Sequence, residues 1–525
     1  MIVALDQDNK ALRDELEAQR KKLNFYADIE EESGNLVVSE DEAERNRLLE
    51  LAKTQILANQ KNSTIQNKSS SQNPRGEEFE GKNSSEKTAS ELVLDPEQQQ
   101  ACEYMRNTKE NIFITGKAGT GKSFLLDAFT GTTSKKFIVL APTGIAALNV
   151  KGVTLHSAFG YDNLVNLALE DITDKTIKLK SEKRLVLQQV ETIIIDEISM
   201  VRADIFDKID RILQVINRND LPFGGKQILA FGDLFQLPPI TKGEEWLYLK
   251  GKYGGSYFYL SHAYKNGNFK FIELTINHRQ NSDKKFFEIL NRVREGKTTS
   301  EDISTLNTRV ITDESINNRI TTLFPTKASA EEVNRQHLME LPSKEYTYQA
   351  RITKNKYPDK TKNMEAVFPI TSTLRLKNGA LVMMVANDPG HRWVNGTLGI
   401  IHELKDDCIY VSINKKTYEV PLAEFKEQEI KYINGKLTYE DVFCVSQFPL
   451  VLAYAITIHK SQGQTYQHIV CDIDNCFTSG QAYVALSRCA SLEGLYLKSQ
   501  VTQKNIQVDH DVLDFYLSQK EKSVI

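Results

Sequence analysis

The sequence predicts an α/β protein with two similar cores, a small inserted β-barrel and a helical N-terminal appendage. From residue 91 onward, short apolar β-branched runs alternate with helical ones, and a glycine-rich loop stands between one such run and a helix. Between about 399 and 447 the pattern changes to alternating strands. A chain of 525 residues is too long for one ordinary core, so we expect several domains.

The first 90 residues are predicted to be an appendage. Residues 1–59 contain two short amphipathic helical stretches, and residues 1–60 carry 14 acidic against 8 basic side chains. Residues 60–90 are nearly devoid of apolar residues, so we expect a disordered linker there. Two interpretations of residues 1–59 stay open: a solvated tail without a specific function, and a helical pair that docks a protein partner.

The first core is expected at 91–265. Its buried strands are predicted at 112–115, 137–141, 192–195 and 227–231. The second core is expected at 266–398 and 448–525, with strands beginning near 271 and resuming at 321–325, 450–453, 469–472 and 495–498. The inserted barrel, 399–447, is predicted from strands at 408–413 and 417–422 and from a turn at Asn434-Gly435.

Composition excludes several classes of protein. The chain is 40% hydrophobic and 26% charged, and no apolar run approaches the ~18 residues that span a bilayer. The N-terminus lacks the basic start and apolar stretch of a signal peptide, and the cysteines form no CxxC pairs. We therefore expect a cytoplasmic protein that has no membrane partner. The formal charge of −4 is concentrated in the acidic N-terminus, so the nearly neutral body can still hold a basic groove.

The glycine-rich loop has the pattern of a phosphate-binding loop. It runs Gly116-Lys117-Ala118-Gly119-Thr120-Gly121-Lys122-Ser123, after a predicted strand and before a predicted helix. The glycines allow backbone N–H groups to surround phosphate oxygens, Lys122 supplies a positive charge, and the Ser123 hydroxyl can ligate Mg²⁺. The loop predicts a nucleotide site.

Two carboxylates follow the strand predicted at 192–195. Asp196 and Glu197 stand at its C-terminal end, where α/β sheets bind ligands. We expect Asp196 to hold Mg²⁺ and Glu197 to act as the base that activates water. Gln236 follows the next strand and is a candidate sensor of the γ-phosphate.

Two arginines in the predicted second core are candidates for a contact across the cleft. Arg279 lies in Asn277-His278-Arg279-Gln280, and Arg488 ends Ala485-Leu486-Ser487-Arg488. An arginine that reaches the γ-phosphate from a second domain makes hydrolysis depend on closure of the two domains.

With these motifs in order, the chain resembles superfamily-one helicases, and specifically the petite integration frequency family, relatives of the RecD-like enzymes. The resemblance covers roughly 91–515. Beyond the phosphate loop and the Asp-Glu pair, it rests on the segments 141–147, 152–157, 232–238, 274–280, 395–399, 457–463 and 483–488.

The resemblance implies two RecA-like domains that bind ATP and Mg²⁺ between them. It implies a helicase that moves 5′ to 3′ on single-stranded DNA, unwinds duplex junctions and serves replication, repair or recombination. Quadruplexes and RNA–DNA hybrids are further possible substrates, and we expect a monomer. Gln98 matches the glutamine that reads adenine, and Gln464 is expected to face the nucleotide. The positions that match DNA-facing residues are Pro142, Thr143, Gly144, Thr154, His156, Ser157, Thr326, Thr457, His459 and Lys460.

The chain departs from the family pattern in two places. His278 stands before Arg279 where an aromatic residue often does. Residues 160–190, where the family places its strand-separating wedge, lack a clear pattern, and Phe159 and Tyr161 are equally good candidates for base stacking or for the core.

Two other functions fit parts of the sequence. One is a translocase or protein-displacing ATPase that moves on single strands without unwinding them. The other is a P-loop switch that binds nucleotide to recruit partners; it predicts a guanine-reading Asn-Lys-x-Asp motif, which the sequence lacks.

Overall fold

The computed structural model describes residues 93–524, apart from 242, 279–282, 313–319 and 357–363. The described residues all belong to one compact unit, 89–525. The predictions for the appendage at 1–59, the linker at 60–90 and Arg279 therefore lie outside the described residues.

The first core is a parallel sheet of six strands in the order β3-β2-β4-β5-β1-β6. The strands are β1 (Ile112–Gly116), β2 (Phe137–Ala141), β3 (Val153–Thr154), β4 (Thr192–Ile195), β5 (Gln227–Phe231) and β6 (Lys270–Leu274). The predictions at 112–115, 137–141, 192–195 and 227–231 are confirmed. These runs form strands because each is largely apolar, buried and covered by helices on both faces.

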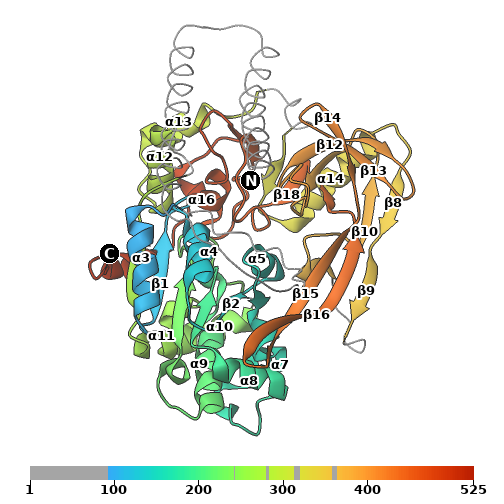
Figure 1. Ribbon diagram of the computed structural model, residues 1–525. Helices are drawn as coiled ribbons and strands as arrows, with labels where there is room; N and C mark the ends of the chain where they lie inside the picture. Colours follow the sequence, from blue (N-terminus) through green and yellow to red (C-terminus); the bar gives the residue numbers. More distant parts are fainter. Residues whose placement is uncertain (1–92, 242, 279–282, 313–319, 357–363, 525) are drawn as a thin grey trace, which may run out of the picture. The chain divides into compact units, whose positions relative to one another are not determined.

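The two faces of this sheet are buried by different helices. On one face Ile112 and Ile114 of β1 pack with α3 (Pro96–Asn107) and α4 (Lys122–Thr132), which lie beside β1 in Figure 1. On the other face Phe113 packs in a cluster with Phe206 and Ile209 of α9 (Ala203–Asn217). Burial of alternate residues on opposite faces holds β1 inside the core, and the phosphate loop begins where this strand ends.

The second core is a parallel sheet of four strands in the order β18-β7-β19-β20. Its members are β7 (Thr322–Phe324), β18 (Ala455–Thr457), β19 (Ile469–Cys471) and β20 (Leu495–Leu497). Three of the four strands match the predicted ranges. The α/β class and the parallel sheets are thus confirmed.

The structure corrects two strand assignments. The strand near Phe271, expected to open the second core, is β6 and pairs in parallel with β1 of the first sheet. The run predicted at 450–453 is β17 (Leu450–Leu452), which pairs antiparallel with β11 (Leu381–Met384) of the inserted sheet. Both runs are buried apolar strands, and nothing in such a run identifies the strand beside which it pairs.

The inserted β structure is larger than 399–447. One antiparallel sheet has the order β14-β13-β12-β11-β17, and smaller sheets have the orders β15-β16-β9 and β10-β8. The remaining strands are β8 (Tyr346–Gln349), β9 (Arg351–Asn355), β10 (Thr373–Leu376), β12 (Leu398–Leu404), β13 (Ile409–Ile413), β14 (Lys416–Val420), β15 (Ala423–Ile433) and β16 (Lys436–Gln447). The predicted turn at Asn434-Gly435 joins β15 to β16, with φ of 51° and 81°.

The remaining helices lie around these sheets. They are α5 (Gly144–Asn149), α6 (Leu155–Phe159), α7 (Tyr161–Val165), α8 (Ser181–Gln189), α10 (Gly243–Tyr253), α11 (His262–Asn266), α12 (Lys284–Arg294), α13 (Ser300–Asn307), α14 (Lys327–Glu340), α15 (Met364–Val367), α16 (Gln481–Leu486) and α17 (His510–Lys520). Among the described residues, every helix is too short or too polar to cross a bilayer.

The segment 160–190, where a wedge was expected, folds as α7, a short 3₁₀ turn at Leu169–Asp171 and α8. Phe159 is fully buried in the core, whereas Tyr161 is 60% exposed. The structure therefore places Phe159 in the core and leaves Tyr161 as the aromatic of this segment that is accessible to a base.

Candidate active site

The phosphate loop connects β1 to α4. Gly119 and Gly121 have φ of 86° and 78°, a left-handed conformation that glycine adopts without strain. At Gly121 a Cβ would also lie 2.4 Å from Nε2 of Gln98, so a larger residue would displace that side chain. The Lys122 ammonium donates to the carbonyl oxygens of Gly116, at 2.7 Å, and Lys117, at 3.2 Å. The lysine thus lies folded onto its own loop.

Gln98 lies against this loop from α3. Its backbone N–H donates to the Asp95 carboxylate, and its side-chain oxygen accepts from the Asp95 N–H, which together form a capping box. Its buried amide Nε2 donates to the carbonyl oxygen of Thr120 at 3.4 Å. Helix capping therefore fixes the predicted adenine-reading side chain beside the loop.

The segment that precedes Arg279 is also attached to the loop. The His278 N–H donates to the carbonyl oxygen of Gly119 at 2.9 Å, and the Asn277 amide donates to that of Ala118 at 2.8 Å. The His278 ring is 2.8 Å from the Asp95 carboxylate. The histidine that departs from the family pattern thus links the loop to the cap of α3.

The two carboxylates lie where β4 ends. Glu197 adopts a left-handed conformation, with φ of 50° and ψ of 44°, which strains a residue with a side chain and is common at functional sites. Burial, together with the charge of Glu197, raises the pKa of Asp196 to about 7. Burial raises the pKa of Glu197 as well, while Lys122 and Arg488 oppose the shift. A carboxyl with a raised pKa is suited to accept a proton.

The predicted Mg²⁺ ligands fit that ion by their chemistry. The Ser123 hydroxyl and the Asp196 carboxylate offer the oxygen ligands that Mg²⁺ prefers. Within the described part of the chain no three His, Cys, Asp or Glu side chains gather to hold a metal. Mg²⁺ usually takes one or two protein ligands and completes its shell with water and phosphate oxygens, so this small ligand set suits it.

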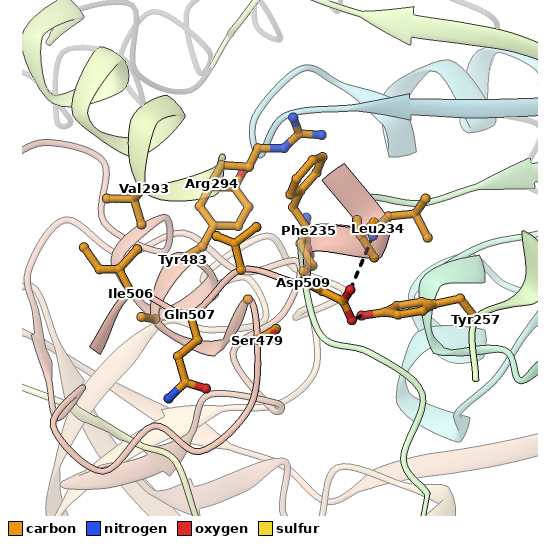
Figure 2. A pocket seen from close by; sticks show the side chains of 15 residues that line it. Leu234, Phe235, Tyr257, Val293, Arg294, Ser479, Tyr483, Ile506, Gln507 and Asp509 are labelled. Carbon is orange, nitrogen blue, oxygen red and sulfur yellow. Dashed lines mark hydrogen bonds between the residues drawn. The ribbon is translucent and has the colours of Figure 1, made fainter. Parts of the chain in front are cut away.

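Gln236 belongs to a buried network that includes an arginine absent from our sequence predictions. Gln236 donates to the Asp233 carboxylate at 3.4 Å, and Arg294 of α12 donates to the same carboxylate at 2.9 Å. The side chains of Asp233 and Arg294 are both fully buried. Figure 2 shows Arg294 above the Phe235 ring, and its guanidinium is 4.1 Å from the ring centroid. A buried arginine on an amphipathic helix gives no periodic signal, which is why sequence patterns did not find it.

Arg488 reaches the same region from the second core. It is buried, and its guanidinium donates to the carbonyl oxygen of Val484 and to the Ser487 hydroxyl, both at 3.0 Å. Burial lowers the pKa of Arg488, while the charge of Glu197 is among the groups that raise it. The predicted arginine and the predicted base therefore interact electrostatically between the two cores.

Two further contacts join the cores at this point. The backbone N–H of Ala118 in the phosphate loop donates to the Tyr483 hydroxyl at 2.9 Å. At Gly480, which caps α16, a Cβ would lie 2.4 Å from the carbonyl oxygens of Phe235 and Gln236. The second core thus contacts both the phosphate loop and the segment that carries Gln236, the predicted γ-phosphate sensor.

The threonines predicted to face DNA share one structural role. Thr143, Thr154 and Thr326 are the N-caps of α5, α6 and α14, and each hydroxyl accepts a backbone N–H three residues later. The Thr457 hydroxyl accepts the N–H of Lys460 in the same way. An N-capped helix end presents its remaining N–H groups, which are suited to phosphate oxygens.

The other predicted DNA contacts adjoin these caps. Pro142 and Gly144 flank Thr143, and a Cβ on Gly144 would lie 2.4 Å from the carbonyl oxygen of Val367. The Ser157 carbonyl oxygen accepts from Lys183 at 2.7 Å. Burial lowers the pKa values of His156, His459 and Lys460.

Several predicted residues of the second core line two separate pockets. Thr457, Lys460 and Gln464 line a cleft of about 800 Å³, to which Asn149 of α5 also contributes. His459 lines a separate hollow of about 450 Å³. Gln464 was expected at the nucleotide; its side chain borders the cleft, while its backbone carbonyl lies 3.4 Å from the Arg488 guanidinium.

Comparisons with known proteins agree with this arrangement. Residues 93–304 match the model of the PIF1-like helicase family. A protein named ATP-dependent DNA helicase Pif1 from Bdellovibrio bacteriovorus is 37% identical over 433 residues, which cover 81% of this chain and 92% of the relative.

The chain belongs to the PIF1-like helicase family. The family resemblance inferred from the motifs, and the prediction of a helicase, are thereby confirmed.

Solved structures of Pif1 helicases share the fold. A Bacteroides Pif1 in complex with ADP-AlF4 has a TM-score of 0.73 and 36% identity, covering 82% of this chain and 98% of that one. A structure that describes DNA unwinding at forked duplex DNA by two coordinating Pif1 helicases has a TM-score of 0.59 and 37% identity, covering 82% and 98%. Among these neighbours, one structure with this fold is named for a bound nucleotide and the other for forked duplex DNA.

Proposed function

We propose that this PIF1-like helicase hydrolyses ATP to move 5′ to 3′ along single-stranded DNA and to separate duplex DNA ahead of it. One observation carries the proposal: Glu197, at the end of β4 in the first core, interacts electrostatically both with Lys122 of the phosphate loop and with Arg488 of the second core. A site built from both cores makes hydrolysis depend on their relative position, which is what a motor requires.

The proposed hydrolysis follows from the chain's own groups. Lys122 leaves the carbonyls of Gly116 and Lys117 to bind phosphate oxygens, and Glu197 takes a proton from the attacking water. Arg488, together with Arg279, stabilises the charge that develops on the γ-phosphate. Mg²⁺, held by Ser123 and Asp196, would supply a positive charge to the phosphates.

Two glutamines complete the proposed nucleotide site. Gln98, attached to the loop at Thr120, reads the adenine, and Gln236 reports whether the γ-phosphate is present. Gln464 lies beside the Arg488 loop and is proposed to sense the nucleotide through it.

The proposed DNA path runs over both cores. Thr143, Thr154, Thr326 and Thr457 cap turns whose free N–H groups bind phosphates without reading bases. His156, His459 and Lys460 add side chains to this path, and burial lowers the pKa of each, which weakens the positive charge it offers to a phosphate. Pro142, Gly144 and Ser157 shape the same turns.

We further propose that the protein acts as a monomer in the cytoplasm. All six cysteines are free, which suits a reducing compartment. A docking role for residues 1–59 stays a proposal of the same kind. Mass photometry on forked DNA tests the monomer, since two copies per fork would contradict it.

The function is tested with the variants Lys122→Ala and Glu197→Gln. Both should bind a 5′-tailed duplex as the wild type does, yet neither should unwind it with ATP and Mg²⁺. Unwinding by either variant would place the hydrolytic site elsewhere. Wild-type protein that displaces streptavidin from single-stranded DNA but leaves the duplex intact would identify a translocase instead.

A further inference from the structure

We propose that Arg294 is a positioning residue for ATP hydrolysis, which acts on the γ-phosphate sensor Gln236 through Asp233. The inference rests on the proposed function and adds a residue to it. Helix α12 then couples the position of the second core to the orientation of Gln236 at the hydrolytic site.

Asp233 is the centre of the network. Its carboxylate accepts the Gln236 amide at 3.4 Å, the backbone N–H of Phe235 at 3.2 Å and the Arg294 guanidinium at 2.9 Å. Its own carbonyl oxygen accepts the N–H of Gln236 at 3.0 Å. The orientation of the Gln236 side chain is thus set by Asp233, and Asp233 is held by Arg294.

The ion pair between Asp233 and Arg294 is inaccessible to solvent. Burial opposes the charge on Asp233, but Arg294 and then Lys122 bring its pKa below the usual value. Burial likewise opposes the charge on Arg294, and the attraction of Asp233 outweighs it, so the pKa of Arg294 is raised. Both groups are therefore charged, and a shift of the arginine would move the carboxylate that orients Gln236.

The arginine is also fixed by two rings. Its guanidinium lies 4.1 Å from the centroid of Phe235 and 5.1 Å from that of Tyr516. Phe235, Arg294 and Tyr483 line a small space (Figure 2), which Gln236 also borders and whose volume of about 10 Å³ is roughly room for one water. Such close packing transmits small displacements rather than absorbing them.

A purely structural arginine buried to this extent would be expected to use all its donors. Nη1 of Arg294 has no partner at hydrogen-bond distance and angle within the described part of the chain, and the Tyr516 hydroxyl is the group that interacts with this guanidinium from α17. Incompletely satisfied buried groups are typical of functional sites, where a rearrangement supplies the missing contact.

The other end of α12 is attached to the arginine loop of the second core. Asp283, the N-cap of α12, accepts the N–H of Phe286 with one oxygen and that of Leu492 with the other, both at 2.9 Å. Leu492 follows Arg488 closely in the chain, and α12 also packs on α16. The helix thus connects the loop of the catalytic arginine to Asp233 over a length of about 16 Å.

The test is a double-mutant cycle in the full chain with Arg294→Met and Gln236→Ala. We expect Arg294→Met to lower kcat for ATP at saturating single-stranded DNA by about tenfold or more, with KM for ATP within about threefold. The double variant should be no slower than the slower single variant, because both substitutions disable one unit.

Arg292→Met is the matched control. Arg292 lies two residues before Arg294 on the same helix. Its guanidinium forms a bidentate ion pair with Asp302, with both hydrogen bonds at 2.7 Å, and this pair is separate from Asp233. Its loss should leave kcat within twofold. If Arg294→Met does not fold, Arg294→Lys replaces it in the cycle; that variant keeps the charge but loses the planar fork, so its kcat should fall between those of the wild type and Gln236→Ala.

Each result decides the proposal. A kcat within twofold of wild type for Arg294→Met, or losses that multiply in the double variant, would overturn the role of Arg294 while leaving the helicase function intact. A wild-type chain with no DNA-stimulated ATP hydrolysis would instead overturn the proposed function, and the role of Arg294 with it.

Discussion

The backbone N–H of Ala118 in the phosphate loop donates a 2.9 Å hydrogen bond to the hydroxyl of Tyr483 in the second core. Both residues are buried, with exposures of 7% and 4%. The Tyr483 hydroxyl therefore accepts a hydrogen bond from a backbone N–H of the phosphate loop, the kind of group that such a loop uses to bind phosphate.

Replacing Tyr483 by Phe should tighten nucleotide binding. The phosphate would no longer displace the hydroxyl, and one hydrogen bond is worth about 1 kcal/mol, so we expect an affinity gain of roughly threefold to tenfold. Titration with a fluorescent ATP analogue measures it. Tyr264→Phe is the control, since that buried hydroxyl has no partner within the described residues; an equal gain there, or weaker binding by the Tyr483 variant, would contradict the account.

The raised pKa of Asp196 predicts a pH dependence of stability. The folded protein holds this proton up to about pH 7, whereas an unfolded aspartate releases it near 4. Stability should therefore rise as pH falls from 8 to 5.5, by at most about 2 kcal/mol from this group. Thermal unfolding without Mg²⁺ or nucleotide measures the rise, and Asp196→Asn should flatten it. A profile equally steep in the variant would show that other groups cause it.

The capping threonines predict a loss of DNA affinity that is independent of sequence. Thr326→Val removes the cap of α14 and should weaken binding of single-stranded DNA about fivefold, equally on oligo-dT and mixed sequences. Fluorescence anisotropy provides the measurement. Thr299→Val removes a comparable cap from α13 and is the control. Similar losses in both variants would mean that helix stability, and not DNA contact, is responsible.

The β15–β16 hairpin predicts a local stability effect. Glu429 of β15 pairs with Lys183 of α8 at 2.8 Å, and both side chains are mostly buried. Glu429→Gln should leave Lys183 inadequately paired and cost about 1 to 3 kcal/mol, seen as faster hydrogen exchange in the hairpin. Glu424→Gln, which removes an exposed pair with Lys426, should change exchange little. Unchanged exchange in the Glu429 variant would show that the pair does not hold the hairpin.

Sequence patterns predicted the elements better than their pairing. The run 192–195 forms β4 where it was expected, since a continuous apolar run with carboxylates after it has few alternatives. The runs at 270–274 and 450–452 are strands too, but each joins a sheet other than the expected one. Pairing depends on crossover geometry, which no local pattern contains.

The same distinction applies to the candidate site, where residues within sequence motifs were predictable and residues joined only by the fold were not. The places of Lys122, Asp196 and Glu197 in the fold were predictable because a phosphate loop and a strand-end carboxylate pair have fixed spacing to their elements. Asp233 and Arg294 were not, since the partner of a buried carboxylate can come from anywhere in the chain. Their ion pair joins residues 61 positions apart and becomes visible only in the fold.

The proposed motor moves in one direction along DNA, and the polarity of unwinding measures that direction. One duplex is prepared with either a 5′ or a 3′ single-stranded tail and mixed with the full chain, ATP and Mg²⁺. We expect rapid strand separation of the 5′-tailed substrate and little of the 3′-tailed one. Equal unwinding of both tails, or unwinding of the 3′-tailed substrate alone, would contradict it.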